Sequence, residues 1–276
     1  MSSGEETDRR YLLRKYNNNR VMIVSDLHLG FEAEWSDKGL DTREPHWSYK
    51  IIDQLKNEVS KTNPNQLLIL GDLEHSFIHF KSSEKDKERI WVSNRWLREK
   101  TLHYFMEQIV KIDSLKVSLI RGNQDTSFLR SLEKLVKIYP QGAELFGQLG
   151  VWHGHTRPSA PILFSSEIML GHVHPAIELI DELKIQHKYP VFVKLTVSRE
   201  EIFHIFDFQL ELEEIGLIDE VTITILPAYN KFLGGFTLNQ RKKKYQSYPV
   251  LSQLLQHPKL RIHLTNGIDL GLLADL

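Results

Sequence analysis

Three short apolar runs in the first half of the chain are each followed directly by polar residues or glycine. The runs are residues 21–24, 67–70 and 117–120, and short apolar runs bounded by turn-forming residues predict buried strands. Between the first two runs, the apolar residues of segment 47–61 recur at helical spacing, which predicts an amphipathic helix that ends before Pro64. Strand, helix and strand in this order predict parallel βαβ units, in which the ends of all three strands lie at one edge of a sheet.

The pattern changes after about residue 145, where short β-type runs become frequent and helical spacing becomes sparse. These runs are residues 149–155, 167–172, 190–195, 202–208 and 221–225. They predict a mixed or antiparallel sheet that packs against the first. Segment 82–111 is highly charged and carries scattered apolar residues, which predicts one long helix or two. Trp91 and Trp96 in this segment are interpreted as core residues, with a lid or a base-stacking surface as the alternative.

The first 20 residues are polar and charged, and we interpret them as a lead-in that contains a short strand or helix. The remainder, residues 21–276, is long enough to bury a sizeable core. We predict that it forms a single domain with a helical insertion at about 80–111.

Composition narrows the class of protein. Of the 276 residues, 41% are apolar and 26% are charged, which is typical of a soluble globular protein. The 35 lysines and arginines nearly balance the 36 aspartates and glutamates, so the net charge predicts no attraction to nucleic acid or a membrane. The one charge run, residues 241–244, is interpreted as a solvated loop. The absence of cysteine excludes disulfides and thiol catalysis, and the lack of a signal peptide or a long apolar run predicts a cytoplasmic location.

Histidines and acidic residues gather where the predicted strands end. Asp26 and His28 follow the first run two positions apart, and residues i and i+2 of an extended backbone point to the same side. His172 and His174 repeat this spacing, and Gly171 before them lets the backbone approach a ligand closely. A carboxylate and a neutral imidazole suit divalent manganese, iron or zinc. One such pair is a weak indication, but five strand ends with aspartate, histidine or glycine predict a metal centre at the rim of the sheet.

The order of these groups resembles that of the calcineurin-like metallophosphoesterase superfamily. The superfamily pattern is Asp-x-His, Gly-Asp, Gly-Asn-His-Asp, His and Gly-His-x-His. Here it stands as Asp26-Leu27-His28, Gly71-Asp72, Gly122-Asn123-Gln124-Asp125, His153-Gly154-His155 and Gly171-His172-Val173-His174. The resemblance covers residues 21–175, and its combined specificity is high because all five motifs occur in the order of the family.

Two further segments are similar to one subfamily, the predicted phosphoesterases associated with DNA ligase (the ICC-like group). Residues 71–75 read Gly-Asp-Leu-Glu-His, similar to that group's Gly-Asp-Leu-Lys-His. Residues 226–230 read Leu-Pro-Ala-Tyr-Asn and precede Gly234 and Gly235, similar to its Leu-Pro-Ala-Phe-Asn followed by Gly-Gly. This resemblance implies phosphodiester substrates, among them nucleotides or nucleic acid, and association with DNA repair or ligation proteins.

The superfamily resemblance implies an α/β fold (α+β in some schemes), a four-layer αββα sandwich of two mixed β-sheets flanked by helices. It also implies two divalent metal ions, manganese first, with iron, zinc or nickel as alternatives. The implied ligands are Asp26, His28 and His174 for the first metal, Asn123, His153 and His172 for the second, and Asp72 as the bridge. Such a site hydrolyses a phosphoester by in-line attack of a hydroxide that bridges the two metals.

Gln124 departs from the superfamily pattern, in which this position is a histidine near the leaving group that can act as general acid. Glutamine donates a hydrogen bond but delivers no proton near neutral pH, so we expect weaker turnover of esters with poor leaving groups and a smaller loss on nitrophenyl esters. His155 or His75 are candidates to replace the acid, and Asp125 matches the residue that orients the missing histidine. The candidate catalytic residues are therefore Asp72, Asn123, Gln124, Asp125 and His155.

Two other classes of function stay open. A non-catalytic metal-binding scaffold of the same fold would use its surface for partners, but degenerate scaffolds usually lose metal ligands, and none is lost here. A nuclease that processes nucleic-acid ends requires a basic groove, and residues 241–244 are the one indication of such a groove. Salt-dependent binding to single strands distinguishes the nuclease.

Overall fold

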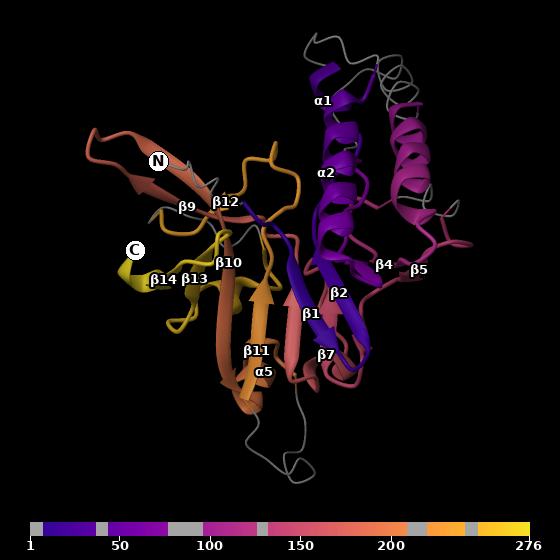
Figure 1. Cartoon of the computed structure of the whole chain (residues 1–276). Coiled ribbons are helices and arrows are strands. Elements are labelled where there is room, and N and C mark those ends of the chain that lie inside the picture. The colour runs from indigo at the N-terminus through magenta and orange to yellow at the C-terminus, as the bar shows by residue number, and fades with distance from the viewer. Residues whose placement is uncertain (1–7, 37–43, 77–95, 126–131, 209–219, 241–247) are drawn as a thin grey trace, which may run out of the picture.

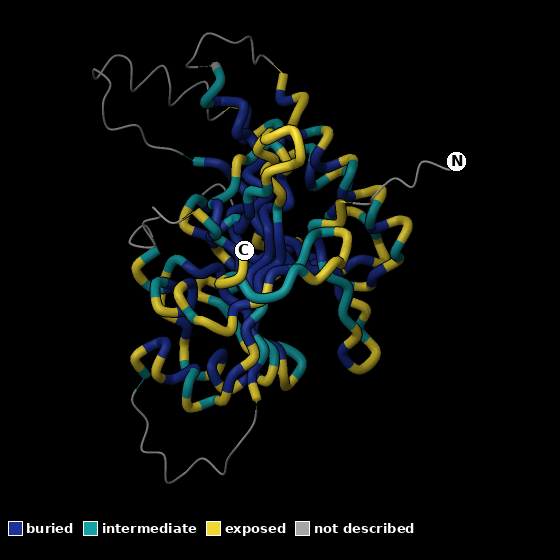
Figure 2. Tube along the Cα trace, turned by 90° about the vertical axis from the view of Figure 1, so that its left-hand side faces the viewer, coloured by how far each residue is buried: buried dark blue, intermediate teal, exposed yellow. Residues whose placement is uncertain are grey.

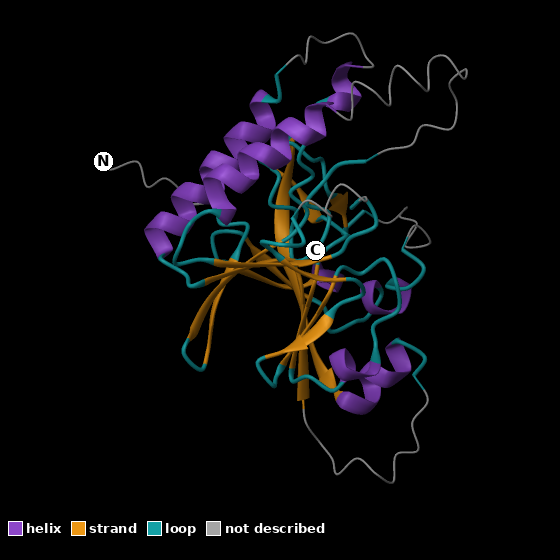
Figure 3. Cartoon of the chain, turned by 90° about the vertical axis from the view of Figure 1, so that its right-hand side faces the viewer, coloured by secondary structure: helices purple, strands orange, loops and turns teal. Residues whose placement is uncertain are grey.

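Two β-sheets lie face to face, and helices cover the outer side of each sheet (Figure 1 and Figure 3). The structure is a computed structural model, and it describes residues 8–36, 44–76, 96–125, 132–208, 220–240 and 248–276. The order of layers is helix, sheet, sheet and helix. The expected four-layer αββα sandwich is therefore confirmed.

The first sheet is built by the first half of the chain. Its strands, in spatial order, are β1 (Leu12–Tyr16), β2 (Asn19–Val24), β3 (Gln66–Ile69), β4 (Lys116–Ile120) and β5 (Lys137–Tyr139). Strands β2 to β5 are parallel, and β1 is antiparallel to β2. The predicted parallel βαβ units are confirmed, and the ends of β2, β3 and β4 meet at one edge.

Helices on the outer face of the first sheet include α2 (His46–Thr62), which confirms the helix predicted at 47–61. Residues 96–105 form a second helix, which continues into the π-helical turn η1 (Met106–Val110), and α1 (Ala33–Ser36) is a single turn. The part of the predicted segment 82–111 that precedes residue 96 lies outside the described residues. None of the helices in the described part of the chain combines the length and the apolar character that crossing a bilayer requires.

Helix α2 shows how the apolar spacing positions an element. Ile51, Ile52, Leu55 and Val59 are buried on the side that faces the sheet, as the helical spacing predicts. The helix ends where Asn63 adopts a left-handed backbone conformation (φ 47°) and donates its N–H to the carbonyl of Val59.

The second sheet is mixed, as predicted, and its order is β12, β9, β10, β11, β8, β7 and β6. The strands are β6 (Ala143–Leu145), β7 (Leu149–Trp152), β8 (Glu167–Leu170), β9 (Pro175–Ile180), β10 (Gln186–Ser198), β11 (Glu220–Ile225) and β12 (Phe236–Thr237), with β13 (Arg261–Leu264) and β14 (Asp269–Leu272) attached to β10. Strands β7, β8 and β11 are parallel, and β10 is antiparallel to β11. The short helices of this half are α4 (Ala160–Leu163), α5 (Arg199–Ile205), α6 (Ser252–Leu255) and η5 (Leu273–Asp275).

The β-type run predicted at 202–208 is wrong, because most of it lies in helix α5. Ser198 caps this helix by accepting a hydrogen bond from the backbone N–H of Glu201 at 3.2 Å. Serine followed three residues later by glutamate is the pattern of a helix start. The signal is therefore present in the sequence, just before the apolar residues that suggested a strand.

Strand β1 lies within the first 20 residues, which we interpreted as a lead-in. Arg14 and Tyr16 of this strand both donate hydrogen bonds to the carboxylate of Glu167 on β8. These contacts tie the first sheet to the second, so the folded sheet begins before residue 21.

Three apolar clusters fill the spaces between the four layers, and Figure 2 shows the buried residues along the middle of the molecule. Along β2, Met22 and Val24 face the helices, whereas Val21 and Ile23 face the second sheet. Because this strand is buried on both faces, its sequence is a continuous apolar run instead of an alternating one.

Candidate metal centre

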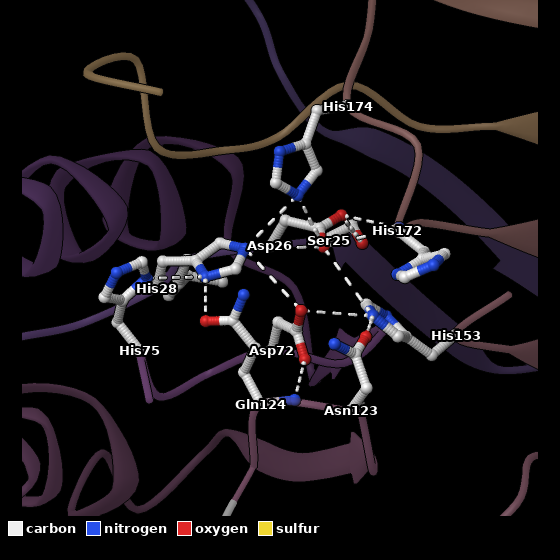
Figure 4. A network of polar contacts seen from close by, with 12 residues as sticks. Ser25, Asp26, His28, Asp72, His75, Asn123, Gln124, His153, His172 and His174 are labelled. Carbon is white, nitrogen blue, oxygen red and sulfur yellow. Dashed lines mark hydrogen bonds and ion pairs between the residues drawn. The ribbon is translucent and has the colours of Figure 1, made fainter. Parts of the chain in front are cut away.

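The side chains predicted to bind metal come together where strands of both sheets end. They follow β2, β3 and β4 in the first sheet and β7 and β8 in the second, and Figure 4 shows them converging on one region. Because the parallel strands of each sheet end at the same rim, residues from five distant segments of the chain become neighbours.

The first group of ligand-type atoms belongs to Asp26, His28 and His174. The Oδ1 atom of Asp26 lies 3.0 Å from Nε2 of His174 and 3.8 Å from Nε2 of His28. The two Nε2 atoms are 3.2 Å apart. One ligand atom from each residue lies within 4.8 Å of the others, close enough to surround a single ion.

The second group belongs to Asp72, His153 and His172, again with one ligand atom each within 4.8 Å. The Nε2 atom of His153 lies 3.2 Å from Oδ2 of Asp72 and 3.1 Å from Oδ1 of Asn123. Asn123 therefore adds an amide oxygen to this group, as the resemblance implies.

Asp72 stands between the two groups. Its Oδ2 atom is 3.7 Å from Nε2 of His28 in the first group and 3.2 Å from Nε2 of His153 in the second. Its other oxygen, Oδ1, accepts a hydrogen bond from the backbone N–H of Gln124 at 2.9 Å, which fixes the orientation of the carboxylate. This is the position that a bridging carboxylate requires.

The donor atoms fit divalent cations. The Nδ1 atom of His153 lies 2.8 Å from the backbone carbonyl of Leu70, to which it donates, so in the neutral ring the lone pair on Nε2 faces Asp72 and Asn123. A lone pair that faces two oxygens at this distance is repelled unless a cation or a proton lies between them. Imidazole nitrogen together with carboxylate and amide oxygen suits divalent manganese, iron or zinc.

Burial and mutual charge set the protonation of these groups. Burial opposes the charge of Asp26, but the neighbouring imidazoles, His174 first, outweigh it and hold the pKa of this carboxyl well below its usual range. Burial also disfavours a charged His153, but the carboxylates of Asp72 and Asp26 raise its pKa to about 9. At His172, burial and the charge of His153 lower the pKa to about 4. When no metal is bound, His153 therefore carries a proton on both ring nitrogens and is positively charged at neutral pH.

The backbone at the site differs from our expectation. We predicted that Asp26 and His28 share one side of an extended strand, but β2 ends at Val24, and both residues adopt left-handed φ angles of 55° and 46°. His172 and His174 behave alike, with φ angles of 70° and 48°. Left-handed residues at alternate positions, not an extended backbone, thus bring each i, i+2 pair together.

Gln124 and Asp125 lie beside the ligands. The Oε1 atom of Gln124 lies 3.2 Å from Nδ1 of His28 and accepts from the backbone N–H of Ser76. Asp125 accepts hydrogen bonds from the backbone N–H groups of Gly122 at 2.8 Å and Glu74 at 3.1 Å, and thereby joins the loops that follow β3 and β4. Burial and the charge of Asp72 raise the pKa of Asp125 to about 7.

The two histidines suggested as replacement acids lie on different sides of the centre. His75 lies behind His28, with its Nδ1 atom 3.1 Å from Nδ1 of His28 and its Nε2 atom 3.2 Å from a carboxylate oxygen of Glu34. His155 packs beside the second group, with its ring centre 5.3 Å from that of His153 and 6.1 Å from that of His172. His155 is therefore the nearer of the two to the second group of ligands.

Three residues that support the ligands carried no prediction. Ser25 donates its hydroxyl to Oδ2 of Asp26 at 2.5 Å, and Glu34 pairs with His75. Asn230 donates its side-chain amide to the carbonyl of Leu27 at 3.0 Å and thereby holds the loop between Asp26 and His28. Asn230 ends the Leu-Pro-Ala-Tyr-Asn segment, so the sequence had singled out its position without indicating its contact.

Two groups of candidate metal ligands, with Asp72 close to a histidine of each, lie at the rim of a four-layer sandwich, an arrangement that fits a metallophosphoesterase. The chain belongs to the calcineurin-like phosphoesterase family, whose sequence model matches residues 19–197. It is accordingly a hydrolase that acts on phosphoester bonds with the help of divalent metal ions. No curated protein matches the chain.

One solved structure supports the fold. The nuclease MPE of Pseudomonas putida is similar to this chain with a TM-score of 0.50 and 17% sequence identity, covering 93% of this chain and 97% of its own. A phosphoesterase from E. coli matches with a TM-score of 0.29 and 16% identity, covering 62% of this chain and 81% of its own. At this identity the first likeness supports the shared fold alone.

Metal affinity is expected to rise with pH up to about pH 9. An ion that occupies the second group displaces the proton held by His153, whose pKa is about 9, so affinity increases by up to about tenfold per unit between about pH 7 and 9. Titration calorimetry with Mn²⁺ at several pH values, in buffers of different ionisation enthalpy, measures both the affinity and the released proton. His153→Asn keeps a ligand-type side chain without a titrating ring and is expected to lose this dependence. The same metal affinity at pH 7 and pH 9 in the native protein would contradict the conclusion that metal displaces a proton from His153.

Proposed function

We propose that the protein hydrolyses phosphodiesters at a centre of two divalent metal ions. The observation that carries the proposal is the position of Asp72 between two groups of ligand atoms, 3.7 Å from His28 and 3.2 Å from His153. Asp26, His28 and His174 would hold the first ion, Asn123, His153 and His172 would hold the second, and Asp72 is placed to serve both. Two divalent ions held there would neutralise the phosphoryl oxygens and lower the pKa of water to supply a nucleophile near neutral pH.

The residues around the ligands keep the centre in this geometry. The carbonyl of Leu70 fixes the tautomer of His153, and Ser25 fixes the carboxylate of Asp26. The backbone N–H of His172 also donates to Asp26 at 3.0 Å, so this buried carboxylate joins the end of β8 to the end of β2. Fixed ligands would hold the cations in place before the substrate arrives, and preorganised positive charge is usually the largest source of stabilisation for a developing negative charge.

Gln124 limits the range of esters in this proposal. Its carbonyl oxygen faces Nδ1 of His28, and an amide delivers no proton to a departing alkoxide. General acid catalysis is typically worth about 10²- to 10⁴-fold, so esters whose leaving group is a nitrophenolate are expected to be cleaved faster than esters of alcohols. His155, beside the second group, is the residue we propose as the substitute acid.

The proposal is tested by stripping the protein of metal, adding back Mn²⁺ and following two chromogenic esters. We expect no hydrolysis without metal, and hydrolysis of bis-p-nitrophenyl phosphate in preference to p-nitrophenyl phosphate once two ions per chain are bound. The preference for the diester follows from the subfamily resemblance. Mass spectrometry of the desalted protein counts the ions.

A pair of histidine variants provides the control. His172→Asn is expected to lose the second ion, whereas His187→Asn, on an exposed residue of β10 paired with Asp181, is expected to keep both. Two bound ions without hydrolysis of either ester would favour the non-catalytic scaffold, and binding of no ion would contradict the metal centre itself. Manganese as the native ion and association with DNA repair or ligation proteins rest on the resemblance, and a cytoplasmic location rests on features of the sequence; all three stay predictions.

A further inference from the structure

Four aromatic rings form a closed cluster beside the metal centre. The ring of Trp47 lies 4.7 Å from that of Phe232 and 6.0 Å from that of Trp35. Phe31 completes the cluster, with its ring centre 5.2 Å from Trp35 and 5.8 Å from Phe232. These separations are those of directly packed aromatic rings. We refer to Phe31, Trp35, Trp47 and Phe232 as the aromatic platform.

The segments that build the platform also support the ligands of the first metal group. Phe31 closes a backbone turn on the carbonyl of His28, only three residues away. Ser48, next to Trp47, accepts a hydrogen bond from the backbone N–H of Gly30 at 2.8 Å. Phe232 donates its N–H to the side chain of Asn230, which in turn holds the loop of Asp26 and His28. The platform is therefore fixed to the edge of the metal centre.

The inner and outer parts of the platform differ in exposure. Phe31 is buried at 4% and packs in the core between α2 and the first sheet, whereas Trp47 is 37% exposed. Trp35 and Phe232 are half-buried. The outer rings thus present an aromatic surface to solvent, on a support that the core holds rigid.

Positive charge accompanies this aromatic surface. The Nζ atom of Lys50 lies 4.5 Å from the centre of the Trp47 ring, and Lys231 is exposed directly before Phe232. Lys50 is three residues from Trp47 on α2, and Lys231 directly follows Asn230, which holds the loop of Asp26 and His28. Trp47 meets Trp35 and Phe232 at interplanar angles of 78° and 64°, so the stacking surface is the exposed ring of Trp47 itself. An exposed indole ring with adjacent cations matches a nucleotide, because a base stacks on the ring and its phosphates attract the lysines.

We infer that the aromatic platform binds the base of a nucleotide whose phosphodiester bond lies at the metal centre. The inference rests on the proposed function and narrows its substrates to nucleotides and single-stranded nucleic acid. A base on the platform fixes the position of the neighbouring phosphodiester, so the platform acts through substrate affinity.

Two esters with the same leaving group test the inference. Thymidine 5′-(p-nitrophenyl phosphate) carries a nucleoside on the retained side, and methyl p-nitrophenyl phosphate carries only a methyl group there. We expect the Mn²⁺-loaded native protein to prefer the thymidine ester, and Trp47→Ala to lower the ratio of the two kcat/KM values about tenfold, mainly through KM. Trp47→Phe keeps a ring and is expected to retain most of the preference.

Phe164→Ala is the matched control. Phe164 is 43% exposed, similar to Trp47, but it lies just before β8 begins, at the edge of the sheet opposite the metal centre. This variant is expected to keep the native ratio. An unchanged ratio in Trp47→Ala, or a fall of both rates in proportion, overturns the inference while the proposed function stands.

Failure of the proposed function gives a different result. If the native protein hydrolyses neither ester, binding alone decides, measured by fluorescence polarisation of a labelled oligothymidylate at several salt concentrations. Binding about tenfold weaker in Trp47→Ala than in the native protein and in Phe164→Ala supports the platform. Equal binding by all three proteins, or no binding, overturns it.

Discussion

Asp72→Asn is expected to reduce kcat/KM for bis-p-nitrophenyl phosphate by about 10³-fold, which is the upper range for removal of one preorganised electrostatic group. Both oxygens of Asp72 are in use, since Oδ1 accepts from the backbone N–H of Gln124 and Oδ2 stands between His28 and His153. An asparagine supplies one oxygen and no charge. It can satisfy the backbone or face the ligands, but it cannot bridge two cations.

Rates are measured at saturating Mn²⁺, and bound metal is counted in the same samples. Asp113→Asn, on an exposed residue of the loop before β4, makes the same chemical change away from the centre and is expected to leave rate and metal content unchanged. Native-like turnover by Asp72→Asn with two ions bound would show that this carboxylate does not bridge.

Gly122→Ala is expected to reduce turnover by about 10²-fold and to destabilise the protein by about 1–3 kcal/mol. A Cβ atom on Gly122 would overlap both the Oδ1 atom and the backbone nitrogen of Asp72. Because the backbone nitrogen cannot move as a flexible side chain would, the loops after β3 and β4 must separate. Asp72 is then displaced from its position between the two groups of ligands.

Denaturant unfolding and the hydrolysis of bis-p-nitrophenyl phosphate measure the two effects in one preparation. Gly234→Ala is the matched control, since no described atom lies within 4 Å of a Cβ at that position. It is expected to unfold and react as the native protein does. If Gly122→Ala retained full activity and stability, the close approach of the two loops would have no role in the site.

The sequence predicted the central strands well, for a physical reason. Strands β2, β3 and β4 are covered on both faces, so each is a continuous apolar run that stands out from its surroundings. Strand β1 is an edge strand that pairs only with β2 in its sheet. Its Arg14 and Tyr16 donate hydrogen bonds to Glu167, which belongs to the other sheet. Such a strand is marked by contacts between distant segments and not by its own composition.

The site was predicted as a set of residues but not as a geometry. Strand ends with aspartate and histidine indicated the ligand types, and the structure brings all seven positions together. The spacing of Asp26 and His28 suggested an extended backbone, whereas both residues are left-handed in the structure. The aromatic platform was not predicted at all, because Trp47 and Phe232 meet only once the whole first sheet and the end of β11 are in place.

Because several ligand residues adopt strained left-handed backbone angles, selection for a more stable protein and selection for catalysis favour different residues at these positions. Asp26, His28, Asp72, His172 and His174 all adopt positive φ angles, a region that costs a non-glycine residue of order 1–3 kcal/mol. A whole domain is typically stable by only about 5–15 kcal/mol, so glycine in place of a ligand histidine relieves a sizeable local strain, whereas at Asp26 or Asp72 it also removes a carboxylate that accepts a backbone hydrogen bond. Screens for heat-resistant variants of this protein will therefore tend to collect changes at its ligands, and they should score turnover together with melting temperature.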